Sequence, residues 1–191
     1  MATKTTMSWD QFVAAGEEWQ RWELVDGEIE FMSPVNLRHE YALSALIAYL
    51  VAFCRAHPEW ACFASNAVFT MASGNWRMPD ASLVRKERFP GGTIPAEKSD
   101  FAPDVAFEIH SPSDRPGQIQ AKRKEYQESG VIQVWIDLEK RLVELIYPDR
   151  PPQYFQEHQG LIIEKLPESP WISRPSTQCS AGLQAGIYYL E

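Results

Sequence analysis

The residues of this chain best suited to chemistry lie in the segment 102–113, APDVAFEIHSPS, and at Lys122 on the next expected helix. In an extended strand alternate residues share a face, so Asp104, Glu108 and His110 lie together, opposite an apolar face. Two carboxylates on one strand face repel each other unless a proton, a cation or a metal ion lies between them. A divalent cation, which takes oxygen ligands, and Lys122 are the candidates for that positive partner.

A further acidic residue and the lysine occupy positions that normally bury apolar side chains. Asp80 opens or lies within an apolar strand, where an aspartate needs a partner. At helical spacing Lys122 aligns with Tyr126 on the face that should pack on a sheet, and an inward lysine usually requires a carboxylate. We therefore expect four residues to converge at one end of a sheet: Asp80, Asp104, Glu108 and Lys122.

The composition is that of an ordinary globular protein. Of its 191 residues, 45% are hydrophobic and 23% are charged. A chain of this length can form one domain that needs no metal or disulfide to fold. Cys54, Cys62 and Cys179 are odd in number and match no zinc spacing, so we expect a reducing, cytoplasmic setting. No apolar run approaches the ~20 residues of a membrane span, and no signal-peptide core is found, so neither a membrane nor secretion is predicted.

The net charge of -8 argues against indiscriminate binding of nucleic acid. The charge is uneven, because residues 10–30 carry seven acids against Arg21 alone, while 76–88 and 115–126 hold an excess of lysine and arginine. The two basic segments flank the acidic strand. They are either a local site that attracts phosphate or simply solvated surface charge.

The elements that must position these residues can be read along the chain. We expect a helix over 8–18, a hairpin turning at Asp26-Gly27, a long helix over 37–57, strands over 60–72, 76–84 and 103–110, a helix over 116–129, and strands over 131–137 and 141–147. The helix at 116–129 predicts a parallel strand pair with a right-handed crossover. This order indicates a mixed α/β sheet flanked by helices.

The domain organisation follows from the same order of elements. We expect a single domain over 1–191, with its core at about 8–147 and an N-terminal β-hairpin within that core. The segment 148–191, which follows a proline-rich break, is expected to be a C-terminal β elaboration of the same domain.

Five motifs, taken in order, resemble those of one nuclease family. They are WELVDGE at 22–28, SPVNLRHE at 33–40, MPDASLV at 78–84, APDVAFEIHSPSD at 102–114 and KRKEYQESGVIQVWIDLE at 122–139. A Pro-Asp on one strand, an acidic residue on the next and a nearby lysine resemble the PD-(D/E)XK nuclease superfamily. More narrowly, the motifs resemble the Uma-two-type family, whose members are described as putative restriction endonucleases. The similarity spans about residues 8–147 and implies a restriction endonuclease-like core.

The resemblance implies Asp80 and Glu108 as metal ligands and Lys122 as the catalytic lysine, with Mg²⁺ as the cofactor and Mn²⁺ as a substitute. In the wider superfamily the lysine often lies two residues after the acidic residue, where this chain has His110. The related family places its lysine on the following helix, which fits Lys122. His110 is then either a substitute polar group or, as we favour, a tolerated change.

Several other residues keep more than one interpretation. Glu23 matches an early glutamate of the family, so it either contacts the metal through water or is an exposed hairpin carboxylate. Asp104 is a direct metal ligand, a group that supports one, or a partner of the lysine. His39 also falls in a family motif, where we favour a structural histidine over one that contacts phosphate. Tyr126 is expected in the core.

The chemistry that the resemblance implies is Mg²⁺-dependent hydrolysis of DNA phosphodiester bonds, with Lys122 offsetting the charge that grows in the transition state. DNA is the expected substrate, and a homodimer would reach both strands. Two alternatives stay open. One is a non-catalytic binding or scaffold protein with the nuclease fold, which the net charge favours. The other is a glycosidase-like hydrolase that uses paired carboxylates and has no need for Lys122.

Overall fold

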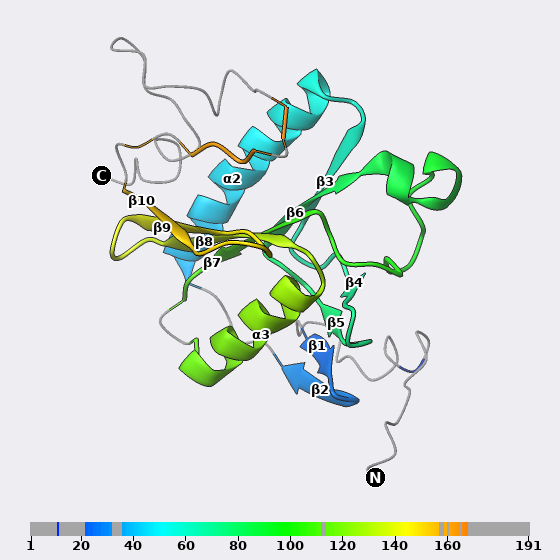
Figure 1. Ribbon diagram of the computed structural model, residues 1–191, viewed down its shortest axis with the longest axis horizontal. Coiled ribbons are helices and arrows are strands. Elements are labelled where there is room, and N and C mark those ends of the chain that lie inside the picture. Colours follow the sequence, from blue (N-terminus) through cyan, green and yellow to red (C-terminus); the bar gives the residue numbers. More distant parts are fainter. Residues whose placement is uncertain are drawn as a thin grey trace.

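Figure 1 shows the computed structural model of the chain, in which a central sheet lies between two helices. The structure describes residues 11, 22–31, 36–111, 114–156, 159, 161–164 and 166–167. The helix expected over 8–18 lies outside the described residues except for Gln11, which is helical. Most of the expected C-terminal elaboration beyond residue 156 also lies outside them.

The main sheet has six strands in the order β10-β9-β8-β7-β6-β3. They are β3 (Trp60–Ala64), β6 (Ala81–Arg85), β7 (Val105–Ile109), β8 (Ile132–Asp137), β9 (Leu142–Ile146) and β10 (Gln153–Gln156). Strands β7 and β8 run parallel, and all other neighbours run antiparallel. The helix α3 (Pro116–Glu128) connects the parallel pair, which confirms the mixed α/β sheet and the predicted parallel strands.

The helices α2 (Leu37–Ala56) and α3 cover opposite faces of this sheet (Figure 1). Val105, Phe107 and Ile109 of β7 pack in one core with the buried side of α2. Ala106 of β7 packs in a second core with Tyr126 of α3. Because side chains alternate along a strand, this arrangement turns Glu108 toward α3, as its spacing predicts.

Helix α2 begins and ends where the sequence predicts. The Asn36 side chain accepts a hydrogen bond of 3.0 Å from the amide of His39 and so caps the helix. The helix stops before Pro58, because the residue preceding a proline avoids the helical region. Helix α2 is long and apolar enough to cross a membrane, but a single such helix is weak evidence of a membrane span. The buried residues of α2 pack on the sheet.

A second, smaller sheet has the order β2-β1-β5-β4. Strands β1 (Trp22–Val25) and β2 (Glu28–Phe31) form the predicted hairpin, with positive φ angles of 52° at Asp26 and 87° at Gly27. Strands β5 (Trp76–Arg77) and β4 (Phe69–Thr70) complete it. Its apolar cluster consists of Trp22, Leu24, Val68, Trp76 and Met78.

The strands expected over 60–72 and 76–84 are each divided between the two sheets, so the prediction of continuous strands is wrong. Asn66, with a φ angle of 110°, lies in the turn between β3 and β4. Pro79, which has no N–H to donate, lies between β5 and β6. Asp80 consequently lies just before β6, where the chain passes from the small sheet into the main sheet.

Replacing Leu24 with alanine should destabilise the protein by about 2–4 kcal/mol, because the lost side chain leaves a cavity in the small sheet's cluster. Leu24 is 5% exposed, whereas Ile94 is 46% exposed in a loop. Ile94→Ala is the control and should change the unfolding free energy by no more than about 0.5 kcal/mol. Urea unfolding measures both, and equal stability of the two variants would contradict the packing of the small sheet.

Candidate active site

Asp80 and Glu108 lie side by side at one end of the antiparallel pair β6 and β7, because the strand register sets the residue before β6 beside the fourth residue of β7. Both residues are nearly buried, with exposed fractions of 4% and 6%. Oδ2 of Asp80 accepts hydrogen bonds from the amide of Ile109, at 2.9 Å, and from Nε2 of His39, at 3.1 Å. Asp80 is therefore fixed by both the sheet and α2.

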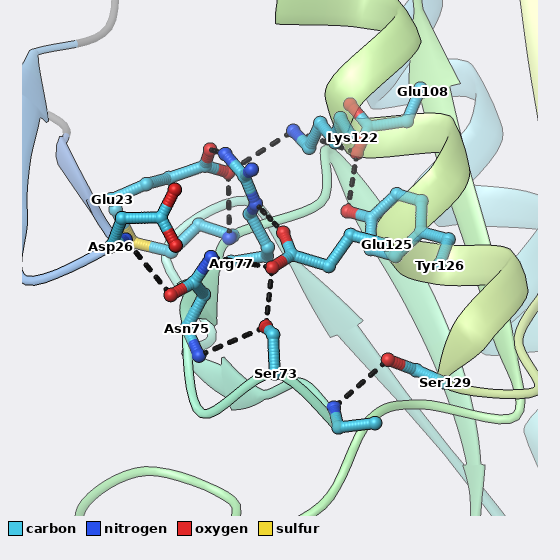
Figure 2. Close-up of polar contacts among 12 residues, drawn as sticks. Glu23, Asp26, Ser73, Asn75, Arg77, Glu108, Lys122, Glu125, Tyr126 and Ser129 are labelled. Atoms are coloured by element: carbon cyan, nitrogen blue, oxygen red, sulfur yellow. Dashed lines mark hydrogen bonds and ion pairs between the residues drawn. The ribbon is translucent and has the colours of Figure 1, made fainter. Parts of the chain in front are cut away.

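Helix α3 presents two polar side chains to Glu108. Lys122 and Tyr126 are one turn apart and share a face of the helix. Nζ of Lys122 lies 2.8 Å from Oε1 of Glu108, and the Tyr126 hydroxyl donates a hydrogen bond of 2.6 Å to the same oxygen (Figure 2). The other carboxylate oxygen, Oε2, is engaged by neither of them.

Lys122 has a second carboxylate partner, which comes from the small sheet. Its Nζ lies 3.1 Å from Oε1 of Glu23 in β1 (Figure 2). Glu23 accepts hydrogen bonds from the Met78 amide, at 2.9 Å, and from NH1 of Arg77, at 2.8 Å. The ammonium therefore bridges the two sheets.

Arg77 joins Glu23 to another carboxylate on α3. Its Nε donates a hydrogen bond to Oε2 of Glu125. Oε1 of Glu125 accepts hydrogen bonds from the side chains of Asn75 and Ser73, in the turn before β5 (Figure 2). Through these bonds the small sheet is attached to α3 beside Lys122.

The buried cluster contains more negative than positive groups among the described residues. Its acids are Glu23, Asp80, Glu108 and Glu125, and its permanent cations are Lys122 and Arg77. His39 adds a third positive charge only when it is protonated. Because uncompensated buried charge is costly, the cluster favours the uptake of a proton or of a further cation.

The affinity of Glu108 for a proton reflects this excess. Burial raises its pKa to about 7, and the charge of Asp80 adds to that effect, although Lys122 and Tyr126 act against it. A carboxyl group that titrates near neutral pH is typical of functional sites. Glu108 therefore exchanges its proton near neutral pH, where an added cation would compete with that proton.

The neighbouring carboxylates shift in the opposite direction. Burial alone would raise the pKa of Asp80, but the hydrogen bond and charge of His39 lower it overall. Burial would also raise the pKa of Glu23, but the charges of Lys122 and Arg77 lower it. Burial disfavours the ammonium of Lys122, yet its carboxylate partners raise its pKa and keep it charged at neutral pH.

The structure brings together four residues predicted for the site, namely Asp80, Glu108, Lys122 and Glu23. The alternative of an exposed hairpin carboxylate is wrong for Glu23, which is 5% exposed. The expected convergence of Asp104 is also wrong. It lies at the other end of β7, bonded to the amide of Arg85 at 2.9 Å and to NH1 of Arg88 at 3.0 Å. Four residues along a strand span about 13 Å, too far to share one ion with Glu108.

The two histidines have different surroundings. His39, for which a structural role was favoured, contacts Asp80 directly and is 2% exposed. The ring of His110 lies 5.4 Å from that of Trp135, and its Nδ1 lies 3.7 Å from the Asp114 carboxylate. These neighbours are not the residues of the carboxylate cluster, which is consistent with a tolerated change at His110.

The sequence did not predict three residues of the cluster as members of the site: Arg77, Glu125 and Tyr126. Tyr126 is buried as expected, but its hydroxyl binds a site carboxylate. Glu125 and Tyr126 lie three and four residues after Lys122, so helical spacing is the signal that could have placed them beside it. No local pattern indicated Arg77, because its partners Glu23 and Glu125 are 54 and 48 residues away along the chain.

The donor set fits a magnesium ion in type and in charge. Asp80 and Glu108 offer carboxylate oxygens, the ligands that Mg²⁺ prefers, within a cluster that has excess negative charge. In the described part of the chain, no group of three or more His, Cys, Asp or Glu side chains is arranged to hold a metal ion. The negative charge of Glu108, which attracts the ammonium of Lys122, would also attract a metal ion.

A mixed sheet with helices on both faces defines an α/β protein, and this one carries Asp80 before β6, Glu108 on β7 and Lys122 on the crossover helix. A profile of the Uma2 family, described as putative restriction endonuclease, matches residues 9–174. The chain therefore belongs to this family, which confirms the resemblance inferred from the motifs.

One solved structure is similar to this chain along nearly the whole length of both. It is described as a putative nuclease belonging to DUF820 from Anabaena variabilis ATCC 29413. Its TM-score is 0.72 at 16% sequence identity, covering 95% of this chain and 98% of that chain. A DrdV–DNA complex matches with a TM-score of only 0.31 at 16% identity, covering 58% of this chain and 11% of that chain. None of the curated proteins matches the chain.

The raised pKa of Glu108 predicts how stability depends on pH in the metal-free protein. The folded protein holds this proton more tightly than the unfolded chain, so wild type loses stability as the pH rises from 4.5 through about 7. Glu108→Gln mimics the protonated acid and lacks this loss. Its unfolding free energy relative to wild type should rise by about 2.5 kcal/mol between about pH 5 and about pH 8, measured by urea unfolding with a chelator.

Glu23→Gln is the matched control with the opposite sign. The pKa of Glu23 is lowered, so its ionised form stabilises the folded state at neutral pH, and that contribution is lost as the pH falls through the folded pKa. Glu23→Gln should therefore be less stable than wild type at neutral pH. Parallel pH profiles for the two variants would contradict the assigned directions.

Proposed function

We propose that this protein is a Mg²⁺-dependent endonuclease that hydrolyses DNA phosphodiester bonds. Its catalytic residues would be Asp80, Glu108 and Lys122. The observation that carries the proposal is the buried cluster in which the described carboxylates outnumber the permanent cations and a lysine points between two of them. Membership of a family described as putative restriction endonuclease supports the same chemistry.

Each residue has a role that follows from its position. Asp80 and Glu108 would hold Mg²⁺, or Mn²⁺ in its place. The metal, when bound, polarises the phosphoryl oxygen and makes bound water more acidic. Lys122, kept charged by its carboxylate partners, offsets the negative charge that develops on the phosphate. His39 and the amide of Ile109 hold Asp80 in one orientation.

DNA is the proposed substrate, although the chain has a net charge of -8. Long-range attraction to phosphate is therefore weak, and we expect binding to depend on the metal and on local basic segments. The proposal includes a homodimer, which would reach both strands, and a cytoplasmic location.

A second candidate is a non-catalytic binding protein with this fold. The observation that favours it is the absence, among described residues, of a ready-made group of three metal-ligating side chains. In that protein Lys122 would serve only as the buried partner of Glu108 and Glu23. Such a protein would bind DNA equally well with and without a divalent cation.

Supercoiled plasmid with Mg²⁺ or Mn²⁺ tests the nuclease directly. Wild type should convert it to nicked or linear DNA, and Asp80→Asn, Glu108→Gln and Lys122→Met should each lower the rate by about 100-fold or more. Glu144→Gln is the control, because Glu144 pairs with Arg123 outside the cluster. Cleavage that persists in all three site variants would refute the assignment, and metal-independent DNA binding without cleavage would support the second candidate.

A further inference from the structure

The two carboxylate partners of Lys122 come from different sheets. Glu108 belongs to β7 of the main sheet, and Glu23 belongs to β1 of the small sheet. The lysine is 9% exposed, so an ammonium that lost its only carboxylate there would be left without a counterion in a poorly solvated place. Glu23 supplies a second counterion, because its carboxylate still balances the charge of the ammonium when Glu108 binds a metal ion.

Glu23 is itself held by several bonds. Its Oε1 accepts from the Met78 amide and contacts Lys122, while its Oε2 accepts from NH1 of Arg77. Arg77 is in turn bonded to Glu125. These charged side chains are buried, so water screens their interactions little and the carboxylate of Glu23 has a defined position.

We propose that Glu23 is the second anchor of the Lys122 ammonium, and that Arg77 and Glu125 are positioning residues that hold Glu23 for this purpose. In the metal-free protein the lysine is shared between Glu23 and Glu108. When Glu108 binds a divalent cation, the lysine shifts its charge pairing toward Glu23 and stays in the site. The proposal rests on the proposed function, because it requires a metal ion at Asp80 and Glu108.

A purely structural network makes a different prediction. If Glu23, Arg77 and Glu125 only attached the small sheet to α3, their loss would change stability, and any effect on metal affinity would not depend on Lys122. If they anchor the lysine, the effect of Glu23 on metal affinity depends on whether Lys122 is present. A double-mutant cycle measures that dependence.

The test uses four full-length proteins: wild type, Glu23→Gln, Lys122→Met and the double variant. Each is titrated calorimetrically with Mn²⁺ in the absence of DNA. Lys122→Met should bind Mn²⁺ about tenfold more tightly than wild type, because a competing cation has been removed. Glu23→Gln should weaken binding about tenfold when Lys122 is present, because the lysine then stays on Glu108, and clearly less in the Lys122→Met background.

Two further variants separate positioning from general damage. Glu125→Gln removes the charge that holds Arg77 and should weaken Mn²⁺ binding in the same direction as Glu23→Gln, but by only about threefold. Glu144→Gln removes a comparable ion pair of α3, with Arg123, and should leave the affinity within about twofold of wild type. Circular dichroism and thermal unfolding check that each protein is folded, and Glu23→Asp replaces Glu23→Gln if the latter is not.

The possible failures are distinguishable. An equal cost of Glu23→Gln in both backgrounds, with Mn²⁺ binding by wild type intact, would overturn this proposal and leave the metal site standing. Weaker binding by Lys122→Met than by wild type would do the same. An absence of Mn²⁺ heat from all four proteins would overturn the metal site and, with it, the role of Glu23.

Discussion

The site depends on one interaction, the placement of the Lys122 ammonium between Glu108 and Glu23. A buried ammonium is costly unless it is paired, so the strand, the helix and the hairpin that supply these three groups must meet in one arrangement. The main sheet, α3 and the small sheet are therefore connected through the same side chain for which a catalytic role is proposed. Any change that moves the small sheet also changes the electrostatic surroundings of the lysine.

The division of the chain at Pro79 makes this arrangement possible. Arg77 and Asp80 are three residues apart, and in a continuous strand they would point to opposite faces. Because the chain leaves β5 and enters β6 at this proline, both side chains reach the cluster, Arg77 beside Glu23 and Asp80 near Lys122. The division that contradicted the expected long strand is thus what places a cation and a proposed metal ligand in the same site.

The sequence predicted the parts of the fold and site that local periodicity determines. Alternation along β7 turned Glu108 toward α3, and helical spacing turned Lys122 toward Glu108, so their meeting followed from two short segments. Alternation also put Asp104 on the face of Glu108, but a shared face does not imply a shared site when the residues are a strand length apart. Arg77 could not be predicted, because its partners lie about fifty residues away and only the tertiary fold brings them together.

The energetics of the cluster bear on whether the protein is an enzyme or only keeps the fold of one. Burial raises the pKa of Glu108 to about 7 beside Asp80, which means that ionisation of Glu108 opposes folding at neutral pH. Well-packed apolar residues in such positions often give equal or greater stability, so folding stability alone does not require this arrangement. Local conflict with folding stability is expected where chemistry requires it. The buried excess of carboxylates around Lys122 and Arg77 therefore supports the proposed binding of a cation over a purely structural role.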